Sequence, residues 1–131
     1  MPTLAIDLGL KRIGIAYSPD NKLALPLNAI IRKNRDRAAR ETLNMIAQYE
    51  IDQIVIGVPI GGKSEDEMRR RAEHFVGLLR LEIPVFYQDE TDSSKEAAKR
   101  SKGRLSKTKD GRLDSLAASI VLERFLERTN G

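Results

Sequence analysis

The chain has 131 residues, of which 40% are hydrophobic, and it carries a formal net charge of +4. This length suits one compact domain, residues 1–131, whose apolar core is large enough to fold without covalent cross-links. Because the sequence contains no cysteine, it excludes disulfides, thiolate zinc sites, iron–sulfur clusters and cysteine nucleophiles.

The first residues, MPTLAIDLG, lack the basic and apolar segments of a signal peptide. No stretch of the sequence approaches the run of about 20 apolar residues that a membrane span requires. We therefore expect a cytoplasmic protein that makes no contact with a membrane.

Three consecutive strands are predicted near the N-terminus. Residues 3–7 are apolar, residues 12–18 carry apolar side chains at alternate positions, and Gly9 lies in the turn between them, which favours a β-hairpin. A third strand, 23–31, follows the turn residues Pro19, Asp20 and Asn21. Strands joined by such short turns predict an antiparallel meander.

Helices and strands alternate in the remaining sequence. Apolar residues at helical spacing predict helices at 34–49 and 65–81, and short apolar runs predict strands at 53–57 and 84–88. Two more helices are predicted at 93–100, where Ser93 and Glu96 could form a capping box, and at 113–126. This order predicts an α/β fold, in which a five-stranded mixed sheet, a meander followed by βα units, is flanked by helices on both faces.

Basic residues are concentrated from the end of the helix predicted at 93–100 to the start of the last predicted helix. One acid, Asp110, accompanies seven basic residues there: Lys99, Arg100, Lys102, Arg104, Lys107, Lys109 and Arg112. Such a segment can neutralise the phosphates of a nucleic acid, and it can equally be a solvated loop. The charge alone does not decide between these two interpretations.

Carboxylates stand at the ends of two predicted strands. Asp7 ends the first strand, where a charge needs compensation unless it lies at the rim of the sheet. An aspartate there can also simply form a turn. Asp89 and Glu90 follow the strand 84–88, and an acid in that place can also cap a helix.

Asp114 is harder to explain as a structural residue. The residues 3, 4, 7 and 11 positions after it are apolar and would share its face of a helix: Ala117, Ala118, Val121 and Phe125. An N-cap is the alternative interpretation. A carboxylate on a face that packs against the sheet is better explained by a nearby cation, for which the small alanines leave room.

Together these acids predict a divalent-metal site at the carboxyl ends of the strands, the rim at which open α/β sheets bind ligands. Carboxylate oxygens suit Mg²⁺ or Mn²⁺ rather than zinc. Two such ions about 4 Å apart can activate water and stabilise the leaving oxygen in phosphodiester cleavage. Lysine and arginine would then neutralise the flanking phosphates of the substrate.

Three segments resemble the YqgF family, also called RuvX, of the ribonuclease-H-like superfamily. Residues 5–16 (AIDLGLKRIGIA) look like its opening motif, residues 56–59 (IGVP) like its Gly-Leu-Pro segment, and residues 109–118 (KDGRLDSLAA) like its C-terminal signature. The middle motif of the family is Asp-Glu-Arg-Leu followed by two hydroxyl residues. The matching stretch, residues 89–94, keeps the acids and hydroxyls but has Thr91 and Asp92 in place of arginine and leucine.

The resemblance implies that Asp7, Glu90 and Asp114 bind metal, with Asp89 as the alternative to Glu90. It implies a nuclease that processes the 5′ end of pre-16S rRNA, on ribosomal precursor particles, and alternatively a Holliday-junction resolvase. Related resolvases place an acid on the fourth strand, which here ends in Gly57, so the analogy with resolvases is weakened. A monomer or a weak homodimer is expected.

The residues that we expect to contact nucleic acid are Lys11, Arg12, Lys102, Arg104, Lys107, Lys109 and Arg112. Lys11, Arg12 and Lys109 could instead be solvated or paired with acids. His74, among polar residues of a helix, is expected on the surface and not in catalysis.

Two other classes of protein were compared with this prediction. A non-catalytic RNA-binding factor for ribosome assembly would use the same acids only as caps and turns, and the missing motif arginine keeps that alternative open. A sugar-kinase or actin-like fold also opens with Asp-x-Gly after a strand. It needs two domains to close around ATP, so 131 residues exclude it.

Overall fold

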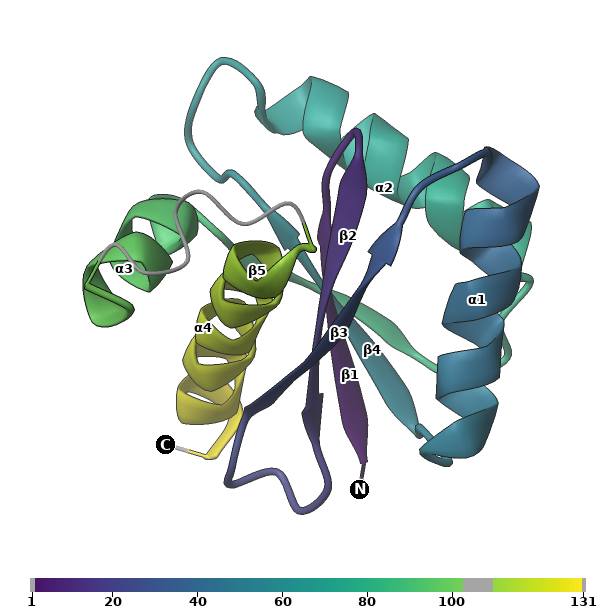
Figure 1. Ribbon diagram of the computed structural model, residues 1–131, viewed down its shortest axis with the longest axis horizontal. Coiled ribbons are helices and arrows are strands. Elements are labelled where there is room, and N and C mark those ends of the chain that lie inside the picture. The colour runs from purple at the N-terminus through teal and green to yellow at the C-terminus, as the bar shows by residue number, and fades with distance from the viewer. Residues whose placement is uncertain (1, 103–109, 131) are drawn as a thin grey trace.

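The computed structural model describes residues 2–102 and 110–130, and a five-stranded sheet forms its centre (Figure 1). The strands are β1 (Thr3–Leu8), β2 (Arg12–Ser18), β3 (Leu25–Ile31), β4 (Gln53–Val58) and β5 (Val85–Asp89). They lie in the order β3-β2-β1-β4-β5. The first three are antiparallel neighbours, whereas β4 and β5 run parallel to β1. The predicted mixed sheet is therefore confirmed.

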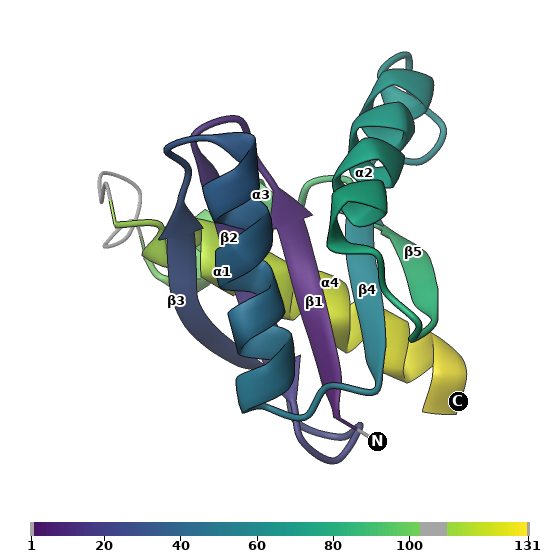
Figure 2. The same ribbon diagram turned by 90° about the vertical axis from the view of Figure 1, so that its right-hand side faces the viewer.

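Helices cover both faces of this sheet, as the sequence predicts (Figure 2). The helices are α1 (Arg35–Gln48), α2 (Glu65–Leu79), α3 (Ser93–Arg100) and α4 (Arg112–Asn130). The pair α1 and α2 packs on one face, and α4 packs on the other face with α3 beside it. None of the helices in the described ranges combines the length and hydropathy that a membrane-spanning helix requires.

Element boundaries agree with the prediction to within about two residues except at the end of α4. β3 begins at Leu25 instead of residue 23, because Oδ1 of Asp20 accepts hydrogen bonds from the backbone N–H groups of Lys22 and Leu23 and extends the turn. The helix predicted at 113–126 continues to Asn130.

The predicted capping box at the start of α3 is wrong. The N-cap is Asp92, with φ of 62°, and no side chain caps the helix. The backbone N–H of Ser93 donates to the carbonyl of Glu90 at 2.9 Å. This tight turn after β5 places Ser93 inside the helix, so its hydroxyl cannot act as the N-cap.

The two faces of the sheet carry side chains of different size, because successive residues of a strand point to opposite faces. Toward α1 and α2 the central strands present large residues such as Leu4, Ile6 and Ile56. Toward α4 they present Ala5, Ala16 and Val55, packed against residues of that helix. Small side chains let α4 approach the sheet closely, and this approach determines the geometry of the site.

Candidate active site

Asp7 lies between two glycines in the row of sheet residues that faces the start of α4. It pairs with Gly14 of β2, and Gly57 is the next residue of β4 after Ile56, which pairs with Ile6. By strand alternation these three residues lie on the same face as Ala5, Ala16 and Val55, which contact α4. Because neither glycine has a side chain, there is room above the sheet on both sides of Asp7 for groups from other elements.

Gly14 allows the first turn of α4 to rest on the backbone of β2. A Cβ atom at this position would overlap the backbone carbonyl of Asp114 and would lie 2.9 Å from the nitrogen of Ser115. The Ser115 hydroxyl also accepts a hydrogen bond from the backbone N–H of Ile15 at 3.1 Å. These contacts hold Asp114 next to the strand pair that carries Asp7.

Gly57 makes the corresponding space on the other side of Asp7. A Cβ atom there would lie 2.9 Å from Oε2 of Glu90 and 3.1 Å from its Cβ. The backbone N–H of Glu90 donates to the carbonyl of Val58 at 3.0 Å, which continues the pairing of β4 and β5. The Glu90 side chain therefore lies over Gly57 and reaches the carboxyl group of Asp7.

Asp7 and Glu90 form a hydrogen-bonded pair of carboxyl groups. Burial raises the pKa of Asp7 well above its ordinary value, and the neighbouring charges of Glu90 and then Asp114 raise it further. Burial also raises the pKa of Glu90, although its hydrogen bond with Asp7 opposes that shift. Two desolvated carboxyl groups in contact require a shared proton or a cation to be stable.

Asp114 is near this pair but is bound to a cation of the protein itself. The guanidinium Nε of Arg12 donates to its Oδ2 at 2.8 Å, and each side chain is about one-third exposed. The cation predicted beside Asp114 is therefore, in this structure, the side chain of Arg12. In the ranges that the structure describes, no three acidic or imidazole side chains form a ready-made metal site.

Asp89 has a different role from Glu90. Its Oδ1 accepts hydrogen bonds from the backbone N–H of Ile60 at 3.2 Å and from the N–H and hydroxyl of Thr91 at 3.0 and 2.6 Å. Partial desolvation raises the pKa of Asp89, but these hydrogen bonds outweigh that effect, so the pKa is lowered overall. Asp89 shapes the turn after β5, and Glu90 is the acid that the structure places against Asp7.

An arginine from α4 supports the same turn, and sequence reasoning missed it. Nη1 of Arg124 donates to the backbone carbonyls of Asp89 at 3.2 Å and of Thr91 at 3.0 Å. A guanidinium thus binds the segment in which the related motif has arginine and this chain has Thr91. The separation of 33 residues between Arg124 and Thr91 left no local signal in the sequence.

A hollow of about 400 Å³ opens at the carboxyl ends of β1, β4 and β5. Carboxyl groups, hydroxyl groups and one lysine line it together with apolar residues: Asp7, Leu8, Pro59, Met68, Glu90, Thr91, Asp92, Ser93, Ser94 and Lys95. The hollow is open at the rim of the sheet, so an extended substrate can reach the carboxyl pair.

Of the predicted nucleic-acid contacts that the structure describes, Arg12 is the one that it pairs with Asp114. Lys11 is exposed in the turn between β1 and β2, and Lys102 is exposed after α3. Arg112 begins α4 and pairs with Asp110 at 2.8 Å. The predicted contacts Arg104, Lys107 and Lys109 lie outside the described residues.

Comparison with known proteins places the whole chain in one family. Residues 1–128 match the family described as "RuvX: Holliday junction resolvase". A Sulfurimonas denitrificans protein named "Putative pre-16S rRNA nuclease" is 51% identical over 128 residues, 98% of each chain. A Campylobacter lari protein of the same name is 53% identical over 125 residues, which are 95% of this chain and 97% of that protein.

Solved structures agree on the fold. T. thermophilus RuvC, in complex with a Holliday junction substrate, superposes with a TM-score of 0.62 at 16% identity, over 100% of this chain and 96% of that chain. A fowlpox virus resolvase bound to junction DNA has a TM-score of 0.59 at 13% identity, over all of both chains. At such low identity these two likenesses establish the ribonuclease-H-like fold alone. The family match over residues 1–128 and the relatives at about half identity show that this chain belongs to the RuvX family.

Proposed function

We propose that this protein is a metal-dependent nuclease that hydrolyses phosphodiester bonds in nucleic acid, with Asp7, Glu90 and Asp114 as its metal ligands. The observation that carries the proposal is the contact between the desolvated carboxyl groups of Asp7 and Glu90, with Asp114 beside them. A folded protein gains no stability from two such groups unless a cation or a proton neutralises them. A divalent cation neutralises them and is also useful in catalysis.

The residues present fit Mg²⁺ or Mn²⁺, since the site offers carboxylate oxygens and contains no sulfur ligand. Such ions, when bound, supply charge stabilisation at the phosphate and lower the pKa of water. Two ions are proposed because three carboxylates exceed the needs of one Mg²⁺ that keeps most of its waters.

Arg12 has a second task in this proposal. Arg12 holds Oδ2 of Asp114, so this oxygen becomes a metal ligand when the ion pair opens. The guanidinium of Arg12 is then available to a substrate phosphate, for which its planar donors are well suited. Lys95, in the hollow, and Lys11, at the tip of the hairpin, are further candidates for phosphate contacts.

We propose the 5′ end of pre-16S rRNA as the substrate, met on ribosomal precursor particles in the cytoplasm. The names of the relatives at 51 and 53% identity, which align over nearly the whole chain, support this choice. The description of the family and the junction-bound structural neighbours support branched DNA as the second candidate.

The test compares wild type, Asp7→Asn and Asp52→Asn on 5′-extended rRNA precursor, single-stranded RNA and four-way DNA junctions. Asp52 is an exposed acid before β4, so its variant controls for the loss of one charge. Reactions contain Mg²⁺, Mn²⁺ or EDTA. We expect cleavage of the precursor by wild type and Asp52→Asn with either metal, and none by Asp7→Asn or in EDTA.

Other results have distinct meanings. Preferential cutting of the junction would replace the rRNA assignment with the resolvase assignment. Cleavage that survives both the Asp7 substitution and the chelator would refute the metal mechanism. If wild type binds RNA without cleaving it, and Asp7→Asn binds RNA with the same affinity, a non-catalytic assembly factor would be favoured.

A further inference from the structure

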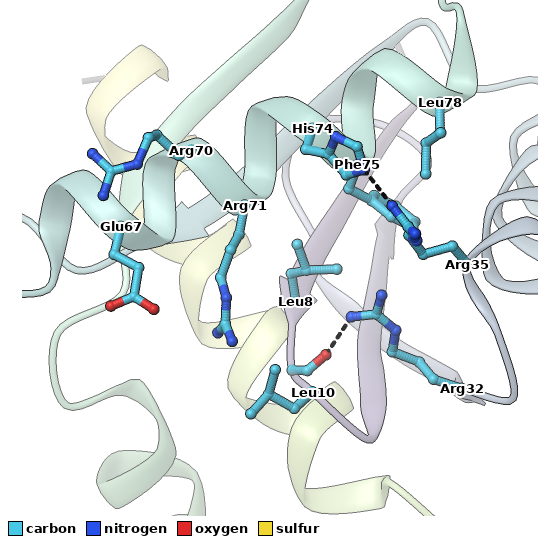
Figure 3. Close-up of a pocket in the computed structure, with 11 residues that line it drawn as sticks. Leu8, Leu10, Arg32, Arg35, Glu67, Arg70, Arg71, His74, Phe75 and Leu78 are labelled. Atoms are coloured by element: carbon cyan, nitrogen blue, oxygen red, sulfur yellow. Dashed lines mark hydrogen bonds between the residues drawn. The ribbon is translucent and has the colours of Figure 1, made fainter.

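A second hollow, of about 360 Å³, lies between the β1–β2 turn, the start of α1 and the face of α2 (Figure 3). Four arginines line it, two from the β3–α1 segment and two from α2: Arg32, Arg35, Arg70 and Arg71. One acid, Glu67, also lines the hollow, so these five groups give it a net charge of +3. None of the residues in this hollow has a place in the mechanism above, although Leu8 also lines the carboxylate site.

The four arginines have no carboxylate partner among the residues that the structure describes. Nη1 of Arg32 donates to the carbonyl of Gly9 at 2.8 Å, and Nη1 of Arg35 donates to Nε2 of His74 at 3.0 Å. Arg71 donates to the sulfur of Met68 at 3.6 Å, its one hydrogen bond to a residue in the described ranges. These partners leave most guanidinium donors unused and neutralise none of the charge.

Other arginines on the same two helices are arranged differently. Arg37 of α1 pairs with Glu41, and Arg69 of α2 pairs with Glu65, each one helical turn away. Such pairs are the ordinary way in which a helix surface balances its charges. The arginines of the hollow come from two elements and none of them forms such a pair, although Glu67 lies three and four residues before Arg70 and Arg71 on α2. Guanidinium groups that line one hollow without a carboxylate partner suit an anionic ligand.

The floor of the hollow is apolar. Leu8, Phe75 and Leu78 line it, and Leu10, 71% exposed at the tip of the hairpin, extends beside it (Figure 3). Guanidinium groups above an apolar floor suit a ligand that has both phosphates and flat apolar faces. A single-stranded nucleic acid is such a ligand, whereas a duplex keeps its base faces stacked and inaccessible.

The position of the hollow indicates which part of a nucleic acid would enter it. Leu8 lines this hollow and also the carboxylate site, and the consecutive residues Glu67 and Met68 line one hollow each. The two sites therefore meet at the end of β1. We propose that the arginine hollow binds the backbone phosphates of an unpaired strand that flanks the bond to be cleaved. This inference rests on the proposed nuclease function, whose substrate it specifies as single-stranded beside the cleavage point.

The experiment measures binding without cleavage. Fluorescence anisotropy of a labelled oligoribonucleotide in EDTA compares wild type with the double variant Arg35→Gln/Arg71→Gln. The matched control is Arg37→Gln/Arg40→Gln, which removes two positive charges from exposed positions of α1 outside the hollow. Circular dichroism verifies that each variant is folded.

We expect the affinity of Arg35→Gln/Arg71→Gln for single-stranded RNA to fall on the order of tenfold. The slope of log Kobs against log salt should decrease by about 1.4, since each phosphate contact on a single strand contributes about 0.7. The control variant should stay within about twofold of wild type, and duplex RNA should bind both variants equally.

Equal binding of RNA by the two double variants would overturn the inference. Two other results would also overturn it. The first is an Arg35→Gln/Arg71→Gln variant that loses affinity for polyglutamate but not for RNA. The second is AMP that binds wild type as tightly as the oligoribonucleotide does. The proposed function is tested separately by cleavage with Mg²⁺ or Mn²⁺. If wild type fails to cleave but the arginine variant still loses RNA affinity, the hollow stands and the nuclease assignment fails.

Discussion

At the scale of single residues, the carboxyl group of Asp7 is placed where its charge opposes folding. Burial and the nearby acids Glu90 and Asp114 all raise its pKa above the ordinary value of 3.8. The folded protein therefore binds this proton more tightly than the unfolded chain does. An ionisable group whose charge destabilises the metal-free protein, and which lies at the rim of the sheet, is typical of a functional site.

The first prediction concerns stability in the presence of a chelator. Because the folded pKa of Asp7 is raised, stability should fall as pH rises above 3.8, through the folded pKa. Asp7→Asn removes this titration, so it should stabilise the metal-free protein at neutral pH by about 1–3 kcal/mol, the cost of an uncompensated buried polar group. Urea unfolding of both proteins from pH 4 to pH 8 measures the difference. Parallel pH profiles, or a destabilised variant, would contradict it.

The second prediction concerns Arg12, which competes with any metal for Asp114. Arg12→Gln should tighten Mn²⁺ binding by up to about fivefold, since partly exposed ion pairs contribute up to about 1 kcal/mol. The same variant should bind RNA more weakly, because a phosphate contact is lost. Calorimetric titration with Mn²⁺ and anisotropy with RNA measure the two effects. If Mn²⁺ binding weakens along with RNA binding, Arg12 does not compete for Asp114.

At the scale of elements, two glycines in neighbouring strands position acids that come from other parts of the chain. Gly14 accepts the first turn of α4, and Gly57 accepts the side chain of Glu90. The site is therefore built by removing side chains from the sheet as much as by adding carboxylates.

The third prediction follows from the contact between Gly57 and Glu90. Gly57→Ala should displace the Glu90 carboxylate and lower the cleavage rate on the order of 100-fold, the effect expected of a misplacement of about 1 Å. The control is Gly77→Ala in α2, where nothing lies within 4 Å of the added methyl group. That substitution should leave cleavage unchanged and raise stability by about 0.5–1 kcal/mol. Equal cleavage by the two variants would exclude a positioning role for Gly57.

Local patterns in the sequence predicted these elements well because each is coded by its own residues. The alternation in β2 and the helical spacing in α1 are examples, and their boundaries differ from the prediction by at most one residue. The end of α4 was missed because the apolar pattern stops at Leu126, whereas the helix continues through polar residues to Asn130.

Contacts between distant residues could not be predicted in this way. Arg12 and Asp114 are separated by 102 positions, and nothing local to either indicates the other. Gly14 and Gly57 did carry a signal, since strand alternation puts each on the same face as a residue two positions away, Ala16 and Val55 respectively. That this face packs against α4 follows only from the structure. The acids themselves were predicted from their places at strand ends, and their gathering around Asp7 depends on the strand order.

At the scale of the whole molecule, the carboxylate site and the arginine hollow adjoin at the end of β1, where Leu8 lines both. Carboxyl groups that need a cation lie on one side, and arginines without a carboxylate partner in the described ranges lie on the other. A nucleic-acid strand that crosses the end of β1 would meet metal ligands at one phosphate and guanidinium groups at neighbouring ones. In the proposed mechanism, the residues that cleave the substrate are thus separate from the residues that bind its flanking phosphates.

The central claim is that folding gathers Asp7, Glu90 and Asp114 into a site for divalent cations. Titration of the full chain with Mn²⁺, followed by the electron paramagnetic resonance of the free ion, tests it without any substrate. Asp7→Asn, Glu90→Gln and Asp114→Asn should each weaken the binding seen in wild type by at least about tenfold, whereas Asp52→Asn should leave it unchanged. Mn²⁺ binding that is the same in all five proteins would contradict the claim.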